Sequence, residues 1–495
     1  MELGAVLLVM AVIFGWGVLS AKLERADLSA PIVFTVVGAL LTVLGLVDAP
    51  AAPETLKPLV ELTLVWVLFC DAARIRVREL RRDTGQYVRL LAVGLPLTIV
   101  AGWLLATWLL PGLGVWLALL VGAALAPTDA ALGIPVVTNA AVPARIRRLI
   151  TVESGLNDGI ATPVVMVAVA GAASAEGLAG VEGLGGALLE LAIGAAVGIA
   201  IGLAGGWLLR RARRAHWAAE NFTGIAVLAL ALLAYTAAVS LHGNGFVAAF
   251  CGGVAFGAVA GRRGRAELVF LEQASGLVSL LVWTAFGAIA LPIIAEGISL
   301  TMVLYAVLSL TLVRMVPVAL ALIKASVDRD TILFIGWFGP RGLASLVFAL
   351  IALEELGNGA HQAVAVIGTT VLLSVLAHGV SAEPLATRYG RAAARHRHPD
   401  VARDRVPFES PAGGAAAGTL LDRQARPERV MSRGRAEPIL RASEVWRERV
   451  PDVARPPRRK GVDDGRRQAR AQGVAVAAGG GAVALRALQG LRPRW

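Results

Sequence analysis

Long apolar segments recur along most of this 495-residue chain, and they restrict its fold more than any other feature. An α-helix rises about 1.5 Å per residue, so about 20 apolar residues can cross the roughly 30 Å hydrocarbon core of a bilayer. With 57% hydrophobic and 17% charged residues, the sequence predicts an all-α polytopic membrane protein. We place thirteen transmembrane helices at residues 2–22, 30–48, 56–75, 86–110, 113–139, 146–172, 184–209, 222–240, 245–261, 268–294, 299–323, 330–354 and 362–387.

The basic residues between these segments predict the orientation of the chain. They follow the odd-numbered segments, as in "RIRVRELRRDTGQYVR" (74–89) and "RRARR" (210–214), whereas Lys57 alone is assigned to the loops after even-numbered segments. Cytoplasmic loops carry the excess of arginine and lysine, so we expect the N-terminus outside and the C-terminus in the cytoplasm. The first segment lacks a basic leader and a cleavage site of small residues, and we interpret it as a retained helix.

Composition divides the chain into two parts. We expect residues 1–390 to form the transmembrane domain and residues 391–495 a cytoplasmic, basic, low-complexity tail without fixed structure. The tail contains most of the excess positive charge, which suits the anionic headgroups of membrane lipid and does not indicate a nucleic-acid partner. It has no nucleotide-binding or metal motif, so no cofactor is expected. Four of the 47 basic residues are lysine, a bias typical of GC-rich bacterial genomes, and we therefore expect a bacterial inner membrane.

Acidic residues interrupt the sixth apolar segment, which reads "RLITVESGLNDGIATPVVMVAVAG" (148–171). A charged side chain within hydrocarbon costs several kcal/mol, roughly 2.5 or more, so such residues usually have a function there. Ser154 and Asp158 are four residues apart and share one face of the helix. Glu153 lies about 140° around the helix from Asp158 and faces elsewhere. We therefore expect one carboxylate to face a pathway and the other a neutralising partner.

Two arginines lie at a suitable depth to neutralise a buried carboxylate, namely Arg341 and Arg314. Arg314 could instead extend its side chain toward the cytoplasmic interface. The sequence by itself leaves both alternatives open.

Two further segments combine charged residues with helix-breaking ones. The fifth contains "AALAPTDAALGIP" (123–135) and the twelfth contains "GWFGPRGLASLVF" (336–348). Proline removes a backbone donor, and discontinuous membrane helices commonly form the sites of secondary transporters. Counted along their helices, Asp129, Asp158 and Arg341 all lie about 16–18 Å from the cytoplasmic side. The two broken segments are seven crossings apart and run in opposite directions, which predicts an inverted repeat of segments 1–6 and 8–13.

Together these motifs resemble those of a known family. "PTDAALG" (127–133), "ESGLNDG" (153–159), "GNGFVAAFCGGVAFG" (243–257) and "GWFGPRGLASLVFAL" (336–350) occur in the order found in the cation:proton antiporter superfamily. Over roughly residues 1–390 the chain is similar to the bacterial, electroneutral type of its sodium/proton exchanger branch. The resemblance implies a homodimer of thirteen-helix subunits, in which a core domain slides against a dimer domain.

The resemblance also implies roles for individual residues. Asp158 would be the ion-carrying carboxylate with Asn157 as its companion, and the other positions associated with the ion site would be Thr128, Asp129 and Ser154. Glu153 and Arg341 match a structural ion pair of the family. Two positions differ from it: Ala130 follows Asp129 where proline is frequent, and Asp71, a possible vestibule residue, stands where glutamate is frequent.

A single shared carboxylate accounts for exchange. A sodium ion prefers several hard oxygen ligands, and protonated Asp158 loses the charge that would bind it. We therefore expect secondary antiport of Na⁺, or of Li⁺ or K⁺, against H⁺, a role in pH homeostasis and no enzymatic activity. For Asp158 the alternative is a buried acid that helix hydrogen bonds satisfy. For Asp129 it is a cap on the half-helix that follows its own break.

Two other classes of membrane protein are alternatives to an antiporter. A cation channel needs a continuous pore, and the sequence contains neither a filter-like carbonyl loop nor a voltage sensor with periodic arginines. A membrane-embedded hydrolase needs a catalytic motif, and neither H-E-x-x-H nor G-x-S-x-G occurs.

Overall fold

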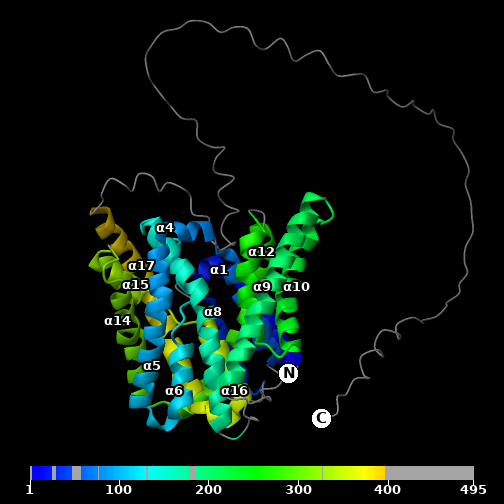
Figure 1. Cartoon of the computed structure of the whole chain (residues 1–495). Helices are drawn as coiled ribbons and strands as arrows, with labels where there is room; N and C mark the ends of the chain where they lie inside the picture. Colours follow the sequence, from blue (N-terminus) through cyan, green and yellow to red (C-terminus); the bar gives the residue numbers. More distant parts are fainter. Residues whose placement is uncertain are drawn as a thin grey trace, which may run out of the picture. The chain divides into compact units, whose positions relative to one another are not determined.

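Figure 1 shows a computed structural model of the chain, which describes residues 3–24, 29–46, 57–75, 77–129, 132–175, 177, 184–261, 264–325 and 327–395. All regular structure in these ranges is helical. Of the tail expected at 391–495, the described residues include 391–395, which belong to the last helix; the remainder lies outside them.

Helix–helix contacts divide the described helices into two bundles. The first bundle contains α1 (Leu3–Glu24), α2 (Ala30–Val43), α3 (Lys57–Arg74), α9 (Leu184–Arg214), α10 (Glu220–Ser240), α11 (Gly245–Val259) and α12 (Gly264–Gly297). The second contains α4 (Val77–Arg89), α5 (Leu95–Leu109), α6 (Gly114–Ala124), α7 (Ile134–Val137), α8 (Ala144–Ala175), α13 (Leu300–Leu310), α14 (Leu312–Ala321), α15 (Arg329–Trp337), α16 (Leu343–Leu356) and α17 (His361–Arg395).

Eight helical stretches of the described residues are long and apolar enough to span a membrane. They are Val6–Leu23, Asp83–Leu109, Ala144–Ala175, Leu188–Arg214, Glu220–Ser240, Glu267–Gly297, Leu300–Ala321 and Leu343–Arg395, and shorter apolar helices occupy Ala30–Val43, Pro111–Ala124 and Gly245–Val259. This confirms an all-helical chain with several candidate membrane spans. Each of the thirteen segments contains at least one helix, but the number of crossings stays a prediction.

Small residues allow helices of the first bundle to approach closely. Gly194, Gly198 and Gly202 recur at every fourth position of α9 and face the backbone of α11. A β-carbon at any of the three would overlap a carbonyl oxygen of α11 or of its N-cap residue Asn244, so a larger residue would push the helices apart. Such packing of small residues is a common source of helix association in membranes, where lipid removes the hydrophobic driving force.

Both predicted breaks are present in the second bundle. Helix α6 ends at Ala124, three residues before Pro127, and α7 begins at Ile134. Helix α15 ends at Trp337 and α16 begins at Leu343, on either side of the Gly-Pro-Arg-Gly sequence. By contrast, α8 is continuous through ESGLNDG, because no residue of that motif prevents helical hydrogen bonding.

Two features were not predicted. The basic stretch after the third segment is not a simple loop: it forms the amphipathic helix α4, which is kinked at Asp83 and continues through the π-helical turn η2 (Leu90–Gly94) into α5. The ion pair between Asp83 of α4 and Arg145 of α8, at 2.7 Å, holds α4 against the start of α8. The eleventh segment is also divided, at Thr311, into α13 and α14.

The two bundles meet where α3, α11 and α12 of the first contact α8, α16 and α17 of the second. The ESGLNDG motif of α8 lies on this contact. A β-carbon at Gly155 would approach Asp71 of α3, and one at Gly159 would overlap the Phe250 ring of α11. The acidic motif is therefore placed between the bundles.

Candidate functional site

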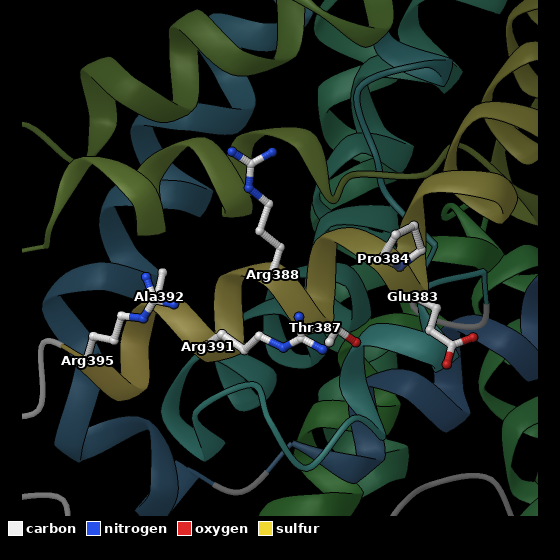
Figure 2. A pocket seen from close by; sticks show the side chains of 7 residues that line it. All are labelled: Glu383, Pro384, Thr387, Arg388, Arg391, Ala392 and Arg395. Carbon is white, nitrogen blue, oxygen red and sulfur yellow. The ribbon is translucent and has the colours of Figure 1, made fainter.

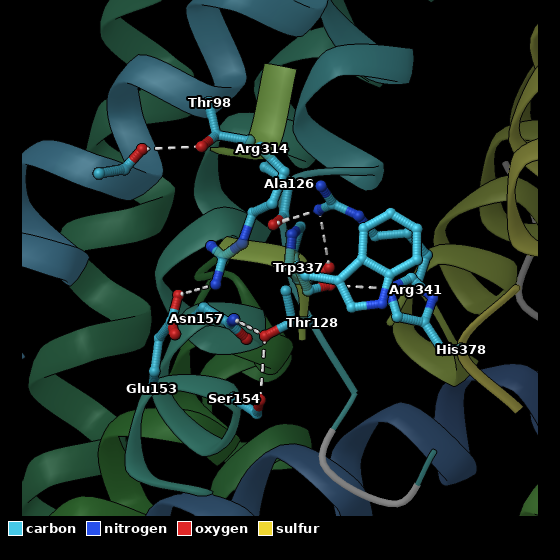
Figure 3. Close-up of polar contacts among 12 residues, drawn as sticks. Thr98, Ala126, Thr128, Glu153, Ser154, Asn157, Arg314, Trp337, Arg341 and His378 are labelled. Carbon is cyan, nitrogen blue, oxygen red and sulfur yellow. Dashed lines mark hydrogen bonds and ion pairs between the residues drawn. The ribbon is translucent and has the colours of Figure 1, made fainter. Parts of the chain in front are cut away.

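The two broken segments bind each other through groups that the breaks release. The Arg341 guanidinium donates through Nη1 to the carbonyl oxygens of Ala126, at 2.5 Å, and Pro127, at 3.1 Å (Figure 3). These carbonyls follow the last turn of α6 and have lost their helical partners. Ser345 of α16 donates to the carbonyl oxygen of Ala124 at 2.6 Å. Arg341 is fully buried, and its charge is directed at backbone dipoles of the opposite break.

Asp129, which follows the first break, forms hydrogen bonds with residues of the second break. Its backbone N–H donates to the carbonyl oxygen of Pro340 at 2.7 Å, and its carboxylate accepts from the backbone N–H of Leu343 at 3.1 Å. Asp129 thus caps a half-helix, but the capped helix is α16 and not the helix after its own break. Gly342 is required beside it, because a β-carbon there would overlap the Asp129 carboxylate.

The predicted pairing of Glu153 with Arg341 is wrong. Glu153 accepts a hydrogen bond from Arg314 Nη2 at 2.6 Å, and both side chains are buried (Figure 3). The physical reason is the division of the eleventh segment at Thr311, which places Arg314 in the first turn of α14, where its side chain reaches Glu153 of α8. Arg314 therefore does not extend to the cytoplasmic interface, and Arg341 is engaged by backbone carbonyls.

A hydroxyl–amide network links the fifth segment to α8. The Thr128 hydroxyl accepts from Asn157 Nδ2 at 2.8 Å and shares a hydrogen bond with the Ser154 hydroxyl at 2.9 Å (Figure 3). All three side chains are buried. The irregular chain after Pro127 directs Thr128 toward α8, where Ser154 and Asn157 lie one helical turn apart.

Asp158 has different surroundings from those of Glu153 and Asp129, which both have hydrogen-bond donors in contact. Its side chain is 8% exposed, and within the described residues its Oδ1 atom has no hydrogen-bond partner. The charges that act on it are those of Asp71 and Asp129, which are also acidic. Glu153, five residues earlier on the same helix, contacts the Arg314 guanidinium, whereas no cation of the described residues forms an ion pair with Asp158.

The sequence match to known proteins identifies the family. The transmembrane sodium/hydrogen exchanger family matches residues 8–388.

The chain belongs to this sodium/hydrogen exchanger family.

Individual relatives of this exchanger-family chain share less than a third of its residues in the matched region. It is 28% identical over 332 residues to the K(+)/H(+) antiporter NhaP2 of Shewanella sp. (strain MR-4). The matched region covers 65% of this chain and 55% of that protein. NhaP2 of Shewanella baltica is 26% identical over 330 residues, with the same coverage. The chain thus matches only about half the length of these relatives.

Solved structures show the same fold. The sodium proton antiporter MjNhaP1 of Methanocaldococcus jannaschii at pH 8 has a TM-score of 0.63 and 19% identity, covering 78% of this chain and 98% of that one. A second structure of MjNhaP1, from electron microscopy, has a TM-score of 0.61 and 21% identity with the same coverage.

The structure of the exchanger-family chain therefore brings the predicted ion-site residues together. Hydrogen bonds join Thr128, Ser154 and Asn157, and the charges of Asp71 and Asp129 act on the Asp158 carboxylate. Among the described residues, no three His, Cys, Asp or Glu side chains form a cluster that could hold a resident metal ion. The oxygen atoms of this site belong to separate carboxylates, to hydroxyls and to backbone carbonyls.

Sequence reasoning missed several contacts of the break. One is the contact of Arg314 with Glu153. In two others, Ser374 of α17 accepts from the backbone N–H of Arg341 at 2.7 Å, and His378 contacts the carbonyl oxygen of Trp337 at 2.9 Å. The sequence does contain one signal of these contacts: Ser374, His378 and Ser381 are polar residues that share one face of an otherwise apolar helix.

A cavity of about 780 Å³ lies elsewhere, at the C-terminal end of α17 (Figure 2). Its lining includes Arg388, Arg391 and Arg395 and a single carboxylate, Glu383. The positive charge makes it unsuited to a cation, and it contains no residue of the candidate site.

Proposed function

We propose that this protein exchanges a monovalent cation for a proton across a membrane, and that the Asp158 carboxylate binds either one. The observation that carries the proposal is the contrast between the two acids of α8. Arg314 neutralises Glu153, whereas Asp158 is buried, its Oδ1 has no hydrogen-bond partner among the described residues, and the charges that act on it are those of the acids Asp71 and Asp129. A buried carboxylate in that state is stabilised by any cation, including a proton.

The cation site we propose consists of Asp158, Asp129, Thr128 and Ser154, with Asn157 holding the Thr128 hydroxyl in place. Carboxylate and hydroxyl oxygens are hard ligands that suit Na⁺, Li⁺ or K⁺. The names of the relatives include both a potassium and a sodium antiporter, so both cations are candidates. Asp71, on α3 beside Gly155, would be a vestibule residue of the first bundle that faces the site.

Obligatory exchange follows from the position of Asp158 between the bundles. An unoccupied carboxylate would carry its charge through an apolar contact whenever the bundles moved past each other, which is unfavourable in membrane protein interiors. A bound proton or cation removes that charge. Only the two occupied forms would then move readily between inward- and outward-facing states.

We further propose thirteen crossings in an inverted repeat, with the N-terminus outside and the C-terminus in the cytoplasm of a bacterial cell. The reciprocal contacts of the two breaks support the repeat. Helix α4, the α9–α10 junction and the end of α17 lie at one end of Figure 1, and all three are rich in arginine. This common end fits the cytoplasmic side. A homodimer and a basic cytoplasmic tail complete the proposed organisation.

Exchange in proteoliposomes tests the proposal. A pH-sensitive dye reports proton movement when Na⁺, Li⁺ or K⁺ is added on one side. The unmodified protein should move protons with at least one cation, without an electrical shunt. Asp158→Asn should abolish this movement, whereas Glu296→Gln, which alters an exposed acid of α12, should not. Equal exchange by the unmodified protein and Asp158→Asn would exclude Asp158 as the carrier, and cation conductance without counter-transport would indicate a channel.

A further inference from the structure

Three polar side chains of α17 face the break between α15 and α16. Ser374, His378 and Ser381 lie at spacings of four and three residues, and so share one face of the helix. Ser381 accepts from the Trp337 indole N–H at 3.0 Å. His378 Nε2 lies 2.9 Å from the carbonyl oxygen of Trp337 (Figure 3). Ser374 accepts from the Arg341 backbone N–H at 2.7 Å.

Two of these contacts are with backbone groups at the ends of the irregular segment between α15 and α16, namely the Trp337 carbonyl and the Arg341 N–H. Phe338 has φ −79° and ψ 67°, an inverse γ-turn in which the Gly339 N–H returns to the Trp337 carbonyl at 2.8 Å. Pro340 has no N–H to continue a helix. The Trp337 carbonyl and the Arg341 N–H are therefore held by residues of α17.

The hydrogen-bond pattern distinguishes between the forms of the His378 ring. Ser374 Oγ already accepts from Arg341, and its own hydrogen can reach His378 Nδ1 at 3.1 Å. With the ring proton on Nε2, each donor then has an acceptor, namely Arg341 N–H, Ser374 O–H and His378 Nε2–H, and the one unfavourable contact is that of the unprotonated Nδ1 with the Ser374 carbonyl at 2.8 Å. The other neutral form would donate from Nδ1 to the Ser374 carbonyl at 2.8 Å, but it would place an unprotonated Nε2 against the Trp337 carbonyl and remove Nδ1 as the acceptor of the Ser374 O–H. It therefore has one more unfavourable contact.

The surroundings favour a neutral ring over an imidazolium. His378 is 1% exposed, and the charged groups that act on it are the cations of Arg341 and Arg314. Among the described residues no carboxylate pairs with the ring. A second positive charge would be buried without a counter-ion, which is highly unfavourable.

We infer that His378 is a positioning residue for exchange: as the neutral Nε2–H tautomer it joins with Ser374 to fix both ends of the break in the twelfth segment. The held segment contacts the proposed cation site directly, because the Pro340 carbonyl accepts from the Asp129 N–H and Arg341 binds the carbonyls before Thr128. Loss of this support lets the Asp129–Thr128 segment relax and weakens cation binding. The inference rests on the proposed exchange function.

Two substitutions separate the roles of the ring nitrogens. The amide nitrogen of glutamine extends about as far as Nε2 of histidine, whereas the shorter asparagine matches only Nδ1. His378→Gln can therefore keep the donor to Trp337, and His378→Asn cannot. Ser374→Ala removes the acceptor for the Arg341 N–H. His361→Gln is the matched control, because His361 is an exposed histidine at the start of the same helix.

The first readout is cation-driven exchange with Na⁺ or K⁺ in proteoliposomes of the full-length protein, after size-exclusion chromatography confirms that each variant is folded. Leaving a buried group unpaired should raise the apparent KM about tenfold in His378→Asn and in Ser374→Ala, with little change in kcat. His378→Gln and His361→Gln should stay within about threefold of the unmodified protein. An apparent KM in His378→Gln as high as that in His378→Asn would overturn the inference. So would the loss of one limb of the pH profile in His378→Gln, because that indicates a proton relay.

The second readout needs no transport and separates this inference from the proposed function. In lipid bilayers, ¹⁵N-histidine NMR resolves protonated and unprotonated ring nitrogens, and His378→Gln identifies the signals of His378 by their loss. We expect a protonated Nε2 and an unprotonated Nδ1. A protonated Nδ1, in either a neutral or a charged ring, would overturn the assignment even if exchange is observed. The expected tautomer in a protein that exchanges no cation would instead contradict the proposed function.

Discussion

Arg314 neutralises Glu153 across 2.6 Å in the protein interior, and of the two acids of ESGLNDG this pair leaves Asp158 as the one that we propose for exchange. With Arg341 engaged by the carbonyls of Ala126 and Pro127, no buried arginine of the described residues contacts Asp158. Both buried arginines are thus held by structural contacts, and neither of them neutralises the Asp158 carboxylate.

The Glu153–Arg314 pair should be important for folding. Arg314→Ala or Glu153→Ala leaves a buried charge unpaired, which typically destabilises a protein by about 3–5 kcal/mol. We expect less folded protein by fluorescence-detected size-exclusion chromatography and a lower Tm for each. The double variant Glu153→Met with Arg314→Met should be more stable than either single variant. Wild-type stability of Arg314→Ala would contradict the pairing.

Gly342 should be required for the contact between the two breaks. Gly342→Ala places a β-carbon on the Asp129 carboxylate and should displace it from the N-terminus of α16. We expect protein that still reaches the membrane but has strongly reduced exchange in proteoliposomes. Gly276→Ala in α12 is the control, because a β-carbon there meets nothing within 4 Å. Full activity of Gly342→Ala would show that Asp129 need not cap α16.

Relative movement of the bundles can be tested at the ion pair between Lys57 of α3 and Glu354 of α16, whose charged atoms lie 2.5 Å apart. A flexible bifunctional thiol reagent across Lys57→Cys and Glu354→Cys, in a background lacking Cys70 and Cys251, should stop exchange. The same reagent across Asp83→Cys and Arg145→Cys joins α4 to α8 within the second bundle and should not. Undiminished exchange after complete Lys57–Glu354 cross-linking would argue against bundle movement.

The orientation can be measured with single cysteines at exposed positions of the two ends. Gly359→Cys, before α17, should react with an impermeant thiol reagent in intact cells. Ala215→Cys, at the α9–α10 junction, should react only after permeabilisation. The arginine-rich ends of α9 and α17 give the physical reason. The reverse pattern of labelling would overturn the proposed topology.

The sequence predicted the parts of the site that have a local cause. Pro127 and the Gly-Pro-Arg-Gly sequence interrupt helices wherever they occur, so both breaks were predictable. Acids within an apolar helix similarly marked ESGLNDG, because their burial is unfavourable without a function. The family match then confirmed the antiporter-like class of protein.

Pairing between segments could not be predicted in the same way. Arg314 and Arg341 are both at a suitable depth, and depth along a helix does not determine which neighbour a side chain faces. The division at Thr311, three residues before Arg314, has no glycine or proline at the break. The support from Ser374 and His378 was also missed, because an isolated polar residue in an apolar helix does not show which backbone group it contacts.

Competition between cation and proton most directly tests whether Asp158 binds both. The apparent KM for Na⁺ or K⁺ is measured in proteoliposomes over a series of pH values, together with the maximal rate. For one shared carboxylate, the apparent KM should rise by up to about tenfold for each unit of falling pH, since one proton is displaced by each cation. The maximal rate should change little. An apparent KM that does not depend on pH, with a maximal rate that falls as pH is lowered, would contradict the shared carboxylate.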